Sequence, residues 1–406
     1  MDKPISQTIH IDDVEYEFLV LVGPIEENFL RIEYDNIDYI DIENDIENGI
    51  PKIQLQVTDI NFETISNVEA NGQTLLNISM TRPDVKIERG RTLVETFVID
   101  DIQLVEAKSN QATYLITGTH IDGQAMADYM DFSATNENPI DIIMKILKKS
   151  NLKVVNEQQL PNVKCNHISG PRDSVSEQCS YLCDMASSTK DGSYFLVYNF
   201  FLSKWTIVST NTIPIDIDKI DENTTYQTDD VESFIIPTEK NTGDKASIVT
   251  ELKQLKLRDK STSGIPAYTV MNYDNIKRKW NVNKITNKLF KTNINQSGKY
   301  LKSVLVDEDP SEERTIYLPT MAGIGSTARN LVLYTDAVTF NVMGNLRKEV
   351  GSFIALETSS VGLDKKFGGV WMIAKINHNI SKAGYRCDIV AVRSVNLKYE
   401  KNERVT

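Results

Sequence analysis

Cysteine is scarce in this sequence of 406 residues, whose four cysteines are Cys165, Cys179, Cys183 and Cys387. Small secreted domains that depend on disulfides carry cysteines at a much higher density. These four are also unevenly placed along a long chain, so they do not indicate a disulfide framework. The sequence therefore predicts reduced thiols.

Long apolar runs are missing as well. No segment approaches the roughly 18 to 20 consecutive apolar residues that a membrane helix needs. The first ten residues include Lys3 but lack the apolar core of about 7 to 15 residues found in a secretory signal. With 40% hydrophobic and 25% charged residues, the composition is typical of a globular protein. We therefore expect a protein that folds in a cytoplasm and does not insert into a membrane.

Positive charge is in deficit, because 44 Lys and Arg stand against 57 Asp and Glu and the net charge is −13. Nucleic acids are held mainly by Lys and Arg that neutralise phosphates, so this balance argues against nonspecific affinity for DNA. The charge is also uneven. Residues 11–50 carry thirteen acids and the single base Arg31, whereas residues 251–302 carry twelve Lys and Arg and three acids. Solvated faces are the simplest interpretation of both runs.

Metal-site spacing is absent. Cys165, His167, Cys179 and Cys183 form the order C-x-H and then C-x3-C, which differs from the C-x2-C spacing of common zinc sites. Cys179 and Cys183 also fall on the apolar stripe of an expected helix, which favours buried free thiols. The sequence therefore predicts no metal site.

Catalytic and cofactor motifs are absent too. The glycines at 323 and 325 precede an expected helix, but the rest of a dinucleotide or P-loop motif is missing, and no Gly-x-Ser-x-Gly occurs. Acid pairs are abundant, yet none stands out as a glycosidase pair. We predict no cofactor and no enzymatic activity. The four histidines are each expected at the surface or in a strand, and the three tryptophans in cores or interfaces: His10, His120, His167, His378, Trp205, Trp280 and Trp371.

The first 120 residues show the alternation of strands. Apolar residues alternate with polar ones at 14–20, 53–57, 76–80 and 85–87. Turn pairs at 48–49 and 71–72 separate these runs, which is typical of an antiparallel barrel or sandwich. Because single cores stop growing at roughly 250 to 300 residues, further modules are expected after this one.

A small α+β module is predicted at residues 121–212. Asn138 and Pro139 form a helix start, and a second helix is expected from Asp173 or Ser174 with Glu177 as a capping-box partner. Strand-like runs follow at 194–201 and 204–208.

A second β-rich module is predicted from residues 213–250 and 311–398, interrupted by a basic insertion at 251–310 and followed by a tail at 399–406. A helix is expected at 326–334 and strands at 338–342, 351–357, 369–377 and 385–393. The fold class is thus mainly β with an α+β domain. No repeat between the two β-rich modules is visible in the sequence.

A family resemblance rests on ordered strand passages near the two ends of the chain. Residues 40–49 (IDIENDIENG) and the strand at 53–59 form one passage, and residues 338–345 (VTFNVMGN) and 350–356 (VGSFIAL) form another. The most specific passage is the hairpin of 371–380 (WMIAKINHNI) and 385–393 (YRCDIVAVR). In these passages the sequence resembles the baseplate hub protein of T-even-like contractile phages. Relatives of that family include the late control D proteins and the N-terminal halves of type VI secretion spike proteins.

The resemblance implies two tube-forming antiparallel β-barrel domains, separated by the small α+β domain and one insertion. It implies a homotrimer whose six barrels form a pseudo-sixfold ring between a hexameric tail tube protein and a trimeric central spike protein. Baseplate wedge proteins are further implied partners, and genomic DNA passes through the channel without specific binding. The implied location is the tail baseplate of a virion assembled in the host cytoplasm.

Four acids in the first β-rich module are candidates for the channel wall. If Asp41, Glu43, Asp45 and Glu47 face the lumen, they repel phosphates and let DNA slide. Solvation on the outer surface is the alternative interpretation.

Two other functions stay open. One is the hub part of a siphophage tail-tip or secretion-system spike, although no β-helix repeat follows the last strand. The other, from a different class, is a carbohydrate-acting or receptor-binding tail protein. The second alternative requires glycan binding or hydrolysis by the isolated chain.

Overall fold

The computed structural model describes most of the chain, in separate segments. These are residues 6–11, 14–24, 29–62, 65, 68, 73–83, 92–156, 165–169, 174–186, 194–200, 202–209, 232–235, 250–255, 268–274, 279–285, 302–307, 336–344, 349–357 and 367–393. The turn pair at 71–72, the apolar pair at 85 and 87, the helix expected at 326–334 and the glycines at 323 and 325 lie outside these residues.

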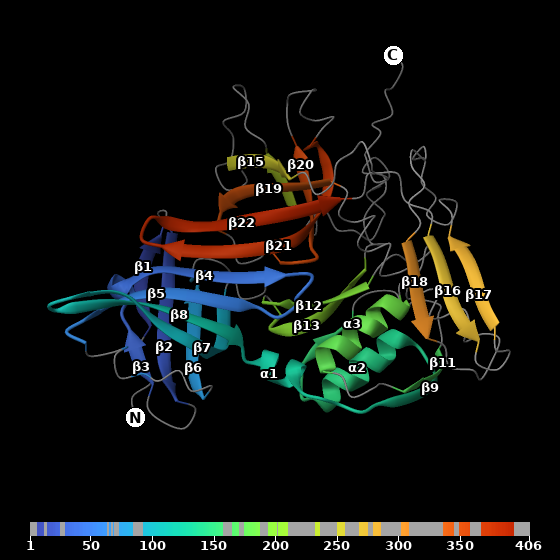
Figure 1. The fold of residues 1–406 in the computed structure, drawn as a ribbon. Coiled ribbons are helices and arrows are strands. Elements are labelled where there is room, and N and C mark those ends of the chain that lie inside the picture. The colour runs from blue at the N-terminus through green and yellow to red at the C-terminus, as the bar shows by residue number, and fades with distance from the viewer. Residues whose placement is uncertain are drawn as a thin grey trace, which may run out of the picture.

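One large sheet of fourteen strands dominates the described residues (Figure 1). Its N-terminal strands are β1 (Gln7–Ile11), β2 (Val14–Pro24), β3 (Leu30–Ile32), β4 (Ile37–Asp45), β5 (Lys52–Ile60), β6 (Thr74–Thr81), β7 (Thr92–Lys108) and β8 (Gln111–His120). Its C-terminal strands are β14 (Glu232–Ile235), β15 (Thr250–Leu255), β19 (Asp336–Met343), β20 (Phe353–Glu357), β21 (Gly369–Ser381) and β22 (Gly384–Arg393). The predicted mainly-β fold class is confirmed.

The sheet order is β1-β2-β6-β7-β8-β5-β4-β21-β22-β19-β15, with β3 beside β2, β20 beside β21 and β14 beside β20. Neighbours along this path are antiparallel, and the β14–β20 pair is parallel. Strands of the N-terminal and C-terminal parts of the chain thus belong to one sheet, and the two parts join where β4 pairs with β21.

Alternating sequence produces these strands because successive side chains point to opposite faces. In β2, Tyr16, Phe18 and Val20 are buried whereas Glu15 and Glu17 are exposed. The strands predicted from the runs at 14–20, 53–57 and 76–80 are confirmed as β2, β5 and β6. A short 3-10 turn, η1 (Tyr34–Asn36), leads into β4.

The α+β part contains α1 (Asp122–Ala127), α2 (Pro139–Lys149) and α3 (Val175–Ala186), with β9 (Ser133–Glu137), β10 (Val154–Val155), β11 (Cys165–Ser169), β12 (Tyr194–Asn199) and β13 (Lys204–Ser209). Helix α2 begins as predicted, because the Asn138 side chain accepts a hydrogen bond from the backbone N–H of Ile140 and Pro139 follows. At α3 the predicted capping box is confirmed, with Ser174 and Glu177 bonding each other's backbone N–H.

Helices α2 and α3 lie on one side of the β10-β13-β12 sheet, and that sheet lies next to the large one (Figure 1). Trp205 of β13 is fully buried, and the buried apolar residues of both sheets form a single core. The α+β part is therefore packed firmly onto the large sheet.

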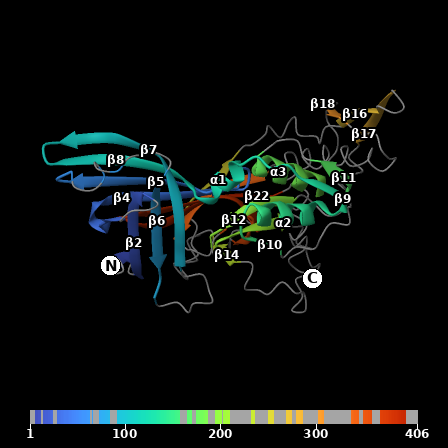
Figure 2. The same ribbon diagram turned by 90° about the horizontal axis from the view of Figure 1, so that it is seen from below.

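A third sheet contains β16 (Tyr268–Asp274), β17 (Lys279–Ile285) and β18 (Lys302–Asp307), in the order β17-β16-β18. It stands at one end of the molecule, apart from the large sheet (Figures 1 and 2). The domain limits themselves stay predictions. The limit placed at residue 250 falls inside β15, a strand that pairs with β19 of the large sheet.

The large sheet contains a structural repeat. Strands β4, β5, β7 and β8 lie side by side in the order β7-β8-β5-β4, and β15, β19, β21 and β22 lie in the matching order β21-β22-β19-β15. In both sets the two strands that come last in the sequence form a hairpin with a two-residue loop. The β7–β8 hairpin closes with Lys108 opposite Gln111, and the β21–β22 hairpin closes with Ser381 opposite Gly384. A further strand, β6 or β20, pairs with the first part of each hairpin.

Candidate functional site

The two repeats meet where β4 pairs with β21. The antiparallel register runs from Asp45 opposite Lys375 to Tyr39 opposite Ser381. This pairing joins residues more than 300 positions apart in the sequence, as the 338-residue separation of Asp41 and Asn379 illustrates. It makes the eight strands of the two repeats one continuous wall.

One side of this wall is covered and the other is open. On β4, Ile40, Ile42 and Asn44 are buried, whereas Asp41 and Glu43 are only half-buried. The strand registers extend the open side over the neighbouring strands, and we call it the polar face. It consists of Tyr39, Asp41, Glu43 and Asp45 of β4; Lys52, Gln54, Gln56 and Thr58 of β5; Leu115, Thr117 and Thr119 of β8; Asp101 and Gln103 of β7; Lys375, Asn377 and Asn379 of β21; Arg386, Asp388 and Val390 of β22; and Thr339, Asn341 and Met343 of β19.

Cross-strand hydrogen bonds and one ion pair hold the polar face together. Asn379 Nδ2 donates to Asp41 Oδ1 at 2.6 Å, and Asn341 Nδ2 donates to Asp388 Oδ1 at 2.6 Å. Lys375 Nζ lies 2.7 Å from Glu43 Oε2. Such pairs across strands each contribute about 0.2 to 1 kcal/mol.

Asp41 has the most perturbed carboxylate of this face. Partial burial raises the pKa of Asp41, the hydrogen bond from Asn379 lowers it, and the nearby Asp388 raises it again, with a net rise above the usual value. Asp41 of β4 thus lies opposite Asn379 of β21 and near Asp388 of β22.

Three of the four acids predicted for a channel wall come together. Asp41, Glu43 and Asp45 lie on the polar face, at alternating positions of β4. Glu47 lies beyond the end of β4, where its backbone N–H donates a hydrogen bond to Asp45 Oδ1 at 2.7 Å. The structure therefore separates Glu47 from the other three.

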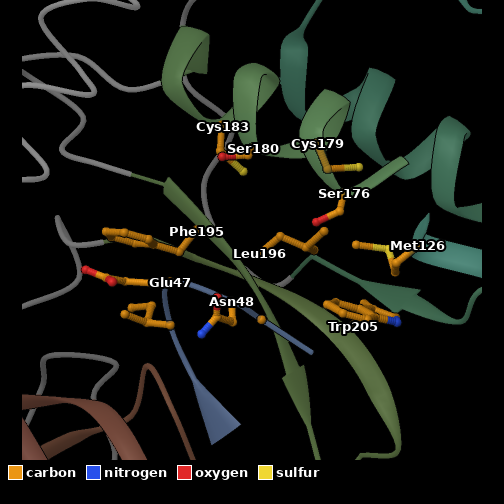
Figure 3. Close-up of a pocket in the computed structure, with 12 residues that line it drawn as sticks. Glu47, Asn48, Met126, Ser176, Cys179, Ser180, Cys183, Phe195, Leu196 and Trp205 are labelled. Atoms are coloured by element: carbon orange, nitrogen blue, oxygen red, sulfur yellow. The ribbon is translucent and has the colours of Figure 1, made fainter. Parts of the chain in front are cut away.

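Glu47 instead lines a small pocket of about 40 Å³ between the β4–β5 turn and the α+β part. Figure 3 shows Glu47 and Asn48 near this pocket, with Cys179 and Cys183 reaching in from α3 and Trp205 below. This volume has room for about three water molecules, whereas small-molecule sites measure roughly 300 to 1,000 Å³. The pocket is thus a packing gap and not a substrate site.

A buried polar network, which we call the Glu95 network, joins the large sheet to the α+β part. Its members are Glu95 of β7, His120 of β8, Tyr198 of β12 and Ser203. His120 Nε2 and the Tyr198 hydroxyl each lie 2.9 Å from Glu95 Oε2, and the His120 and Glu95 side chains are 3% and 2% exposed. Ser203 Oγ donates to Glu95 Oε1 at 3.4 Å.

The Glu95 network is closed around its histidine. The backbone N–H of Asp122 donates to His120 Nδ1 at 3.2 Å, which leaves the ring proton on Nε2 for donation to Glu95. The Tyr198 ring contacts the His120 ring at 4.3 Å between centroids, with the two planes tilted by 43°. Burial, together with Glu95, raises the pKa of Tyr198 well above its usual value. A group of this composition could transfer protons. Because it is buried, we interpret it as a structural contact that holds the α+β part against the large sheet.

A second buried group lies behind the β21–β22 hairpin. His378 Nδ1 lies 2.8 Å from the Tyr385 hydroxyl and 3.4 Å from Cys387 Sγ, and all three residues are buried. Burial lowers the pKa of His378 to about 4, so its ring is neutral near pH 7. Each histidine was expected at the surface or in a strand, and His120 and His378 lie in strands but are buried. One signal of a buried polar group was present in the sequence, because Glu95 lies between Leu93 and Phe97 on the apolar side of its strand.

The cysteines weighed as zinc ligands behave as core residues. Cys179 and Cys183 are buried thiols on α3, and burial raises the pKa of Cys179. This confirms the predicted buried thiols. The side chains of Cys165 and His167 lie outside the described atoms, and among the described residues no group of three metal-binding side chains occurs.

Trp205 and Trp371 are buried, as expected for core residues, and the Trp371 indole donates to the Phe367 carbonyl at 2.8 Å. Within the described part of the chain, no helix is long and apolar enough to cross a membrane. The described residues thus form a wall with one polar face and one face that packs on the core.

Comparison with known proteins gives matches in structure alone. No protein-family model matches the sequence, and no curated protein matches it. Among solved structures, a tail protein from Neisseria meningitidis MC58 superposes with a TM-score of 0.59 at 10% identity, covering 93% of this chain and 96% of that one. The 43 kDa tail protein of prophage MuSo2 from Shewanella oneidensis superposes with a TM-score of 0.58 at 11% identity, covering 93% and 99%. The chain therefore has the fold of these two tail proteins.

Proposed function

We propose that this chain is a structural hub protein of a phage-type contractile tail. Three copies form a pseudo-sixfold ring between the hexameric tail tube and the trimeric central spike, and the ring encloses a channel for DNA. The role is that of a scaffold, without catalysis. The ring belongs to the tail baseplate of a virion, where baseplate wedge proteins surround it.

The continuous polar face is the observation that carries this proposal. Its rows cross the junction of the two repeats without a break, as in the row of Asn341, Asp388, Asn377, Glu43 and Lys52. A sheet with one polar face suits the lining of a water-filled tube, because its opposite face already packs on the core.

The repeat supports the pseudo-sixfold arrangement. Two like units in one chain, multiplied by three copies, make six units around an axis. A sixfold tube can dock on these units, while the three α+β parts keep threefold order for a spike. The two superposable tail proteins have this fold over nearly their whole length.

The charge of the polar face suits passage of DNA without retention. Acids outnumber bases on it, with Asp41, Glu43, Asp45, Asp101 and Asp388 against Lys52, Lys375 and Arg386. A negative wall repels phosphates within about one Debye length, about 8 Å at physiological ionic strength. Asp41, Glu43 and Asp45 are the lumen-facing candidates, and Glu47 is not on this face.

The test is the mass and shape of the purified chain. We expect trimers by mass measurement in solution, alone or after addition of the central spike protein of the same phage. Electron micrographs of these trimers should show rings with an open centre. A chain that stays monomeric under both conditions, or trimers without an open centre, contradicts the proposal.

A further inference from the structure

Two strand edges of the eight-strand wall have no neighbour among the described residues. β15 stands at the end of the sheet and pairs with β19 alone. β7 pairs with β6 up to Val98 and with β8 as far as Lys108, so its outer edge from Ile99 to Lys108 is unpaired. Figure 2 shows this part of β7 as the outermost strand of a projecting hairpin. Unpaired edges are ready to pair with another chain.

The repeat makes each of these edges equivalent to a strand of the junction inside the chain. β15 occupies the place of β4, and β7 occupies the place of β21. Inside the chain, β4 and β21 pair. The wall also has eight strands that alternate in direction, so β15 of one copy runs antiparallel to β7 of the next.

Residue equivalences follow from the two hairpin loops. Asn379 pairs with Arg386 and Glu106 pairs with Thr113, at the same distance from their loops, so Glu106 is equivalent to Asn379.

On the other edge, Asp41 pairs with Gln54, which pairs with Thr117. In the second repeat Lys253 pairs with Thr339, which pairs with Val390. Thr117 and Val390 take the same place in their hairpins, so Lys253 is equivalent to Asp41.

We infer that β15 of one copy pairs antiparallel with β7 of the next copy, in the register of the β4–β21 junction, with Lys253 opposite Glu106. This inference deepens the proposed function, because it names the strands that join the copies of the ring. The occupant of both edges is therefore a second copy of this chain.

Charge complementarity supports the register. Where Asp41 meets Asn379 inside the chain, the equivalent position between copies brings together a cation and an anion. Lys253 is exposed, and Glu106 has a side-chain exposure of 57% next to Lys108. An ion pair at this position extends the ordered pairs of the polar face from one copy to the next.

The pairing also covers exposed apolar side chains. Leu104 and Val105 are 58% and 56% exposed on the projecting strand, although β7 continues a well-packed sheet. β7 has one extra residue relative to β8 between Leu104 and Glu106, so the register places Leu104 opposite Gln254. Gln254 is two positions from Leu252, which is only partly buried against the core. Apolar residues on an otherwise charged edge are typical of a surface that a partner covers.

A disulfide test follows, with the full chain carrying Lys253→Cys and Glu106→Cys. Directly opposed residues in an antiparallel pair have Cα atoms about 4.5 to 5.5 Å apart, which a disulfide spans. Under mild oxidation we expect covalent dimers and trimers on a denaturing gel. Each single variant should stay at the monomer mass, which also controls for the natural cysteines.

The matched control for register is Lys253→Cys with Gln103→Cys. Gln103 lies on the same face of the same strand, but it is displaced along β7 from the position opposite Lys253. We expect this pair to cross-link far less than the first. Equal cross-linking of both pairs contradicts the register.

Charge reversal tests the same contact without cysteines. Lys253→Glu and Glu106→Lys should each lower the association constant about fivefold, because like charges then stand opposite each other. The double variant should restore association. Two single effects that simply add in the double variant contradict direct contact between the two residues.

The outcomes separate this inference from the proposed function. A trimeric ring that is seen by electron microscopy but is not locked by the Lys253 and Glu106 cysteines overturns the strand pairing and leaves the ring standing. A chain that stays monomeric in solution with the spike and also fails to cross-link overturns both.

Discussion

The two sides of the large sheet use similar polar residues for opposite purposes. On the polar face, Asp41 and Glu43 pair with Asn379 and Lys375 across strands while remaining partly open to water. On the covered side, Glu95 accepts hydrogen bonds from His120 and Tyr198 where nearly all water is excluded. On the polar face, water screens the charges and can replace a lost hydrogen-bond partner. On the covered side, a buried polar group that loses its partner stays unpaired. Loss of a partner should therefore cost much more on the covered side.

The largest effect is expected from Glu95→Ala. Removal of this buried acid leaves the His120 N–H and the Tyr198 hydroxyl without an acceptor. Each buried donor left without an acceptor costs about 1 to 3 kcal/mol. We therefore expect the free energy of unfolding, measured by urea denaturation, to fall by about 2 to 6 kcal/mol. Glu43→Ala on the polar face is the control and should cost at most about 1 kcal/mol. Equal losses for the two variants contradict the contrast between the faces.

The next effect is a pH dependence centred on His378. In the folded state the pKa of His378 is about 4, whereas the ordinary value is 6.5. The unfolded chain therefore binds an additional proton between these values, so stability falls as the pH falls from about 6.5 to 4.

For a single group with this shift, the loss of unfolding free energy is about 3 kcal/mol at most. The variant His378→Gln, measured by urea denaturation across the same pH range, should show a flatter profile. An unchanged slope in this variant would show that other groups carry the pH dependence.

A smaller effect is expected from Tyr198→Phe. The ring packing on His120 and Trp205 persists, but the hydrogen bond to Glu95 is lost. A hydrogen bond to a charged acceptor contributes about 1.5 to 3 kcal/mol, which predicts an unfolding free energy lower by about 2 kcal/mol. Tyr114→Phe, at a half-buried tyrosine of β8, serves as a control with little expected change. Equal losses of unfolding free energy for the two variants would argue against a stabilising role of the Tyr198–Glu95 hydrogen bond.

The smallest effect is expected from Asp41→Asn. Burial and Asp388 raise the pKa of Asp41, so its charge is unfavourable where it stands, and an amide of the same shape relieves this cost. We expect an unchanged or slightly higher free energy of unfolding, within about 1 kcal/mol, in thermal and urea denaturation. Glu43→Gln, which loses the ion pair with Lys375, should move in the opposite direction. A large loss of unfolding free energy for Asp41→Asn would contradict the inference that the charge of Asp41 is unfavourable at this position.

Local features of the molecule followed from local sequence. The alternation in β2, β5 and β6, the Asn138 and Pro139 start of α2 and the Ser174 and Glu177 capping box were all predicted correctly. Each depends on residues a few positions apart, so a single segment contains the complete signal. The burial of Cys179 and Cys183 followed from helical periodicity in the same way.

The candidate site was only partly predictable. Asp41, Glu43 and Asp45 were recognised as one set because alternation places them on one face, but Glu47 was grouped with them since the end of β4 could not be located. Lys375, Asn379 and Asp388 were missed, because their nearness to β4 depends on pairing between distant segments. The Glu95 network was missed for the same reason.

The sequence by itself determined the strands, the helix ends and the sides on which apolar residues gather, because these arise from contacts between near neighbours in the chain. Only the tertiary structure decided that β4 pairs with β21 and that β15 stands where β4 does in the other repeat. The two repeats preserve the alternation of buried and open positions but not the residues, as Asp41 and Lys253 illustrate. Alternation is common to most half-buried strands, so it cannot specify which strands pair, and long-range packing makes that choice.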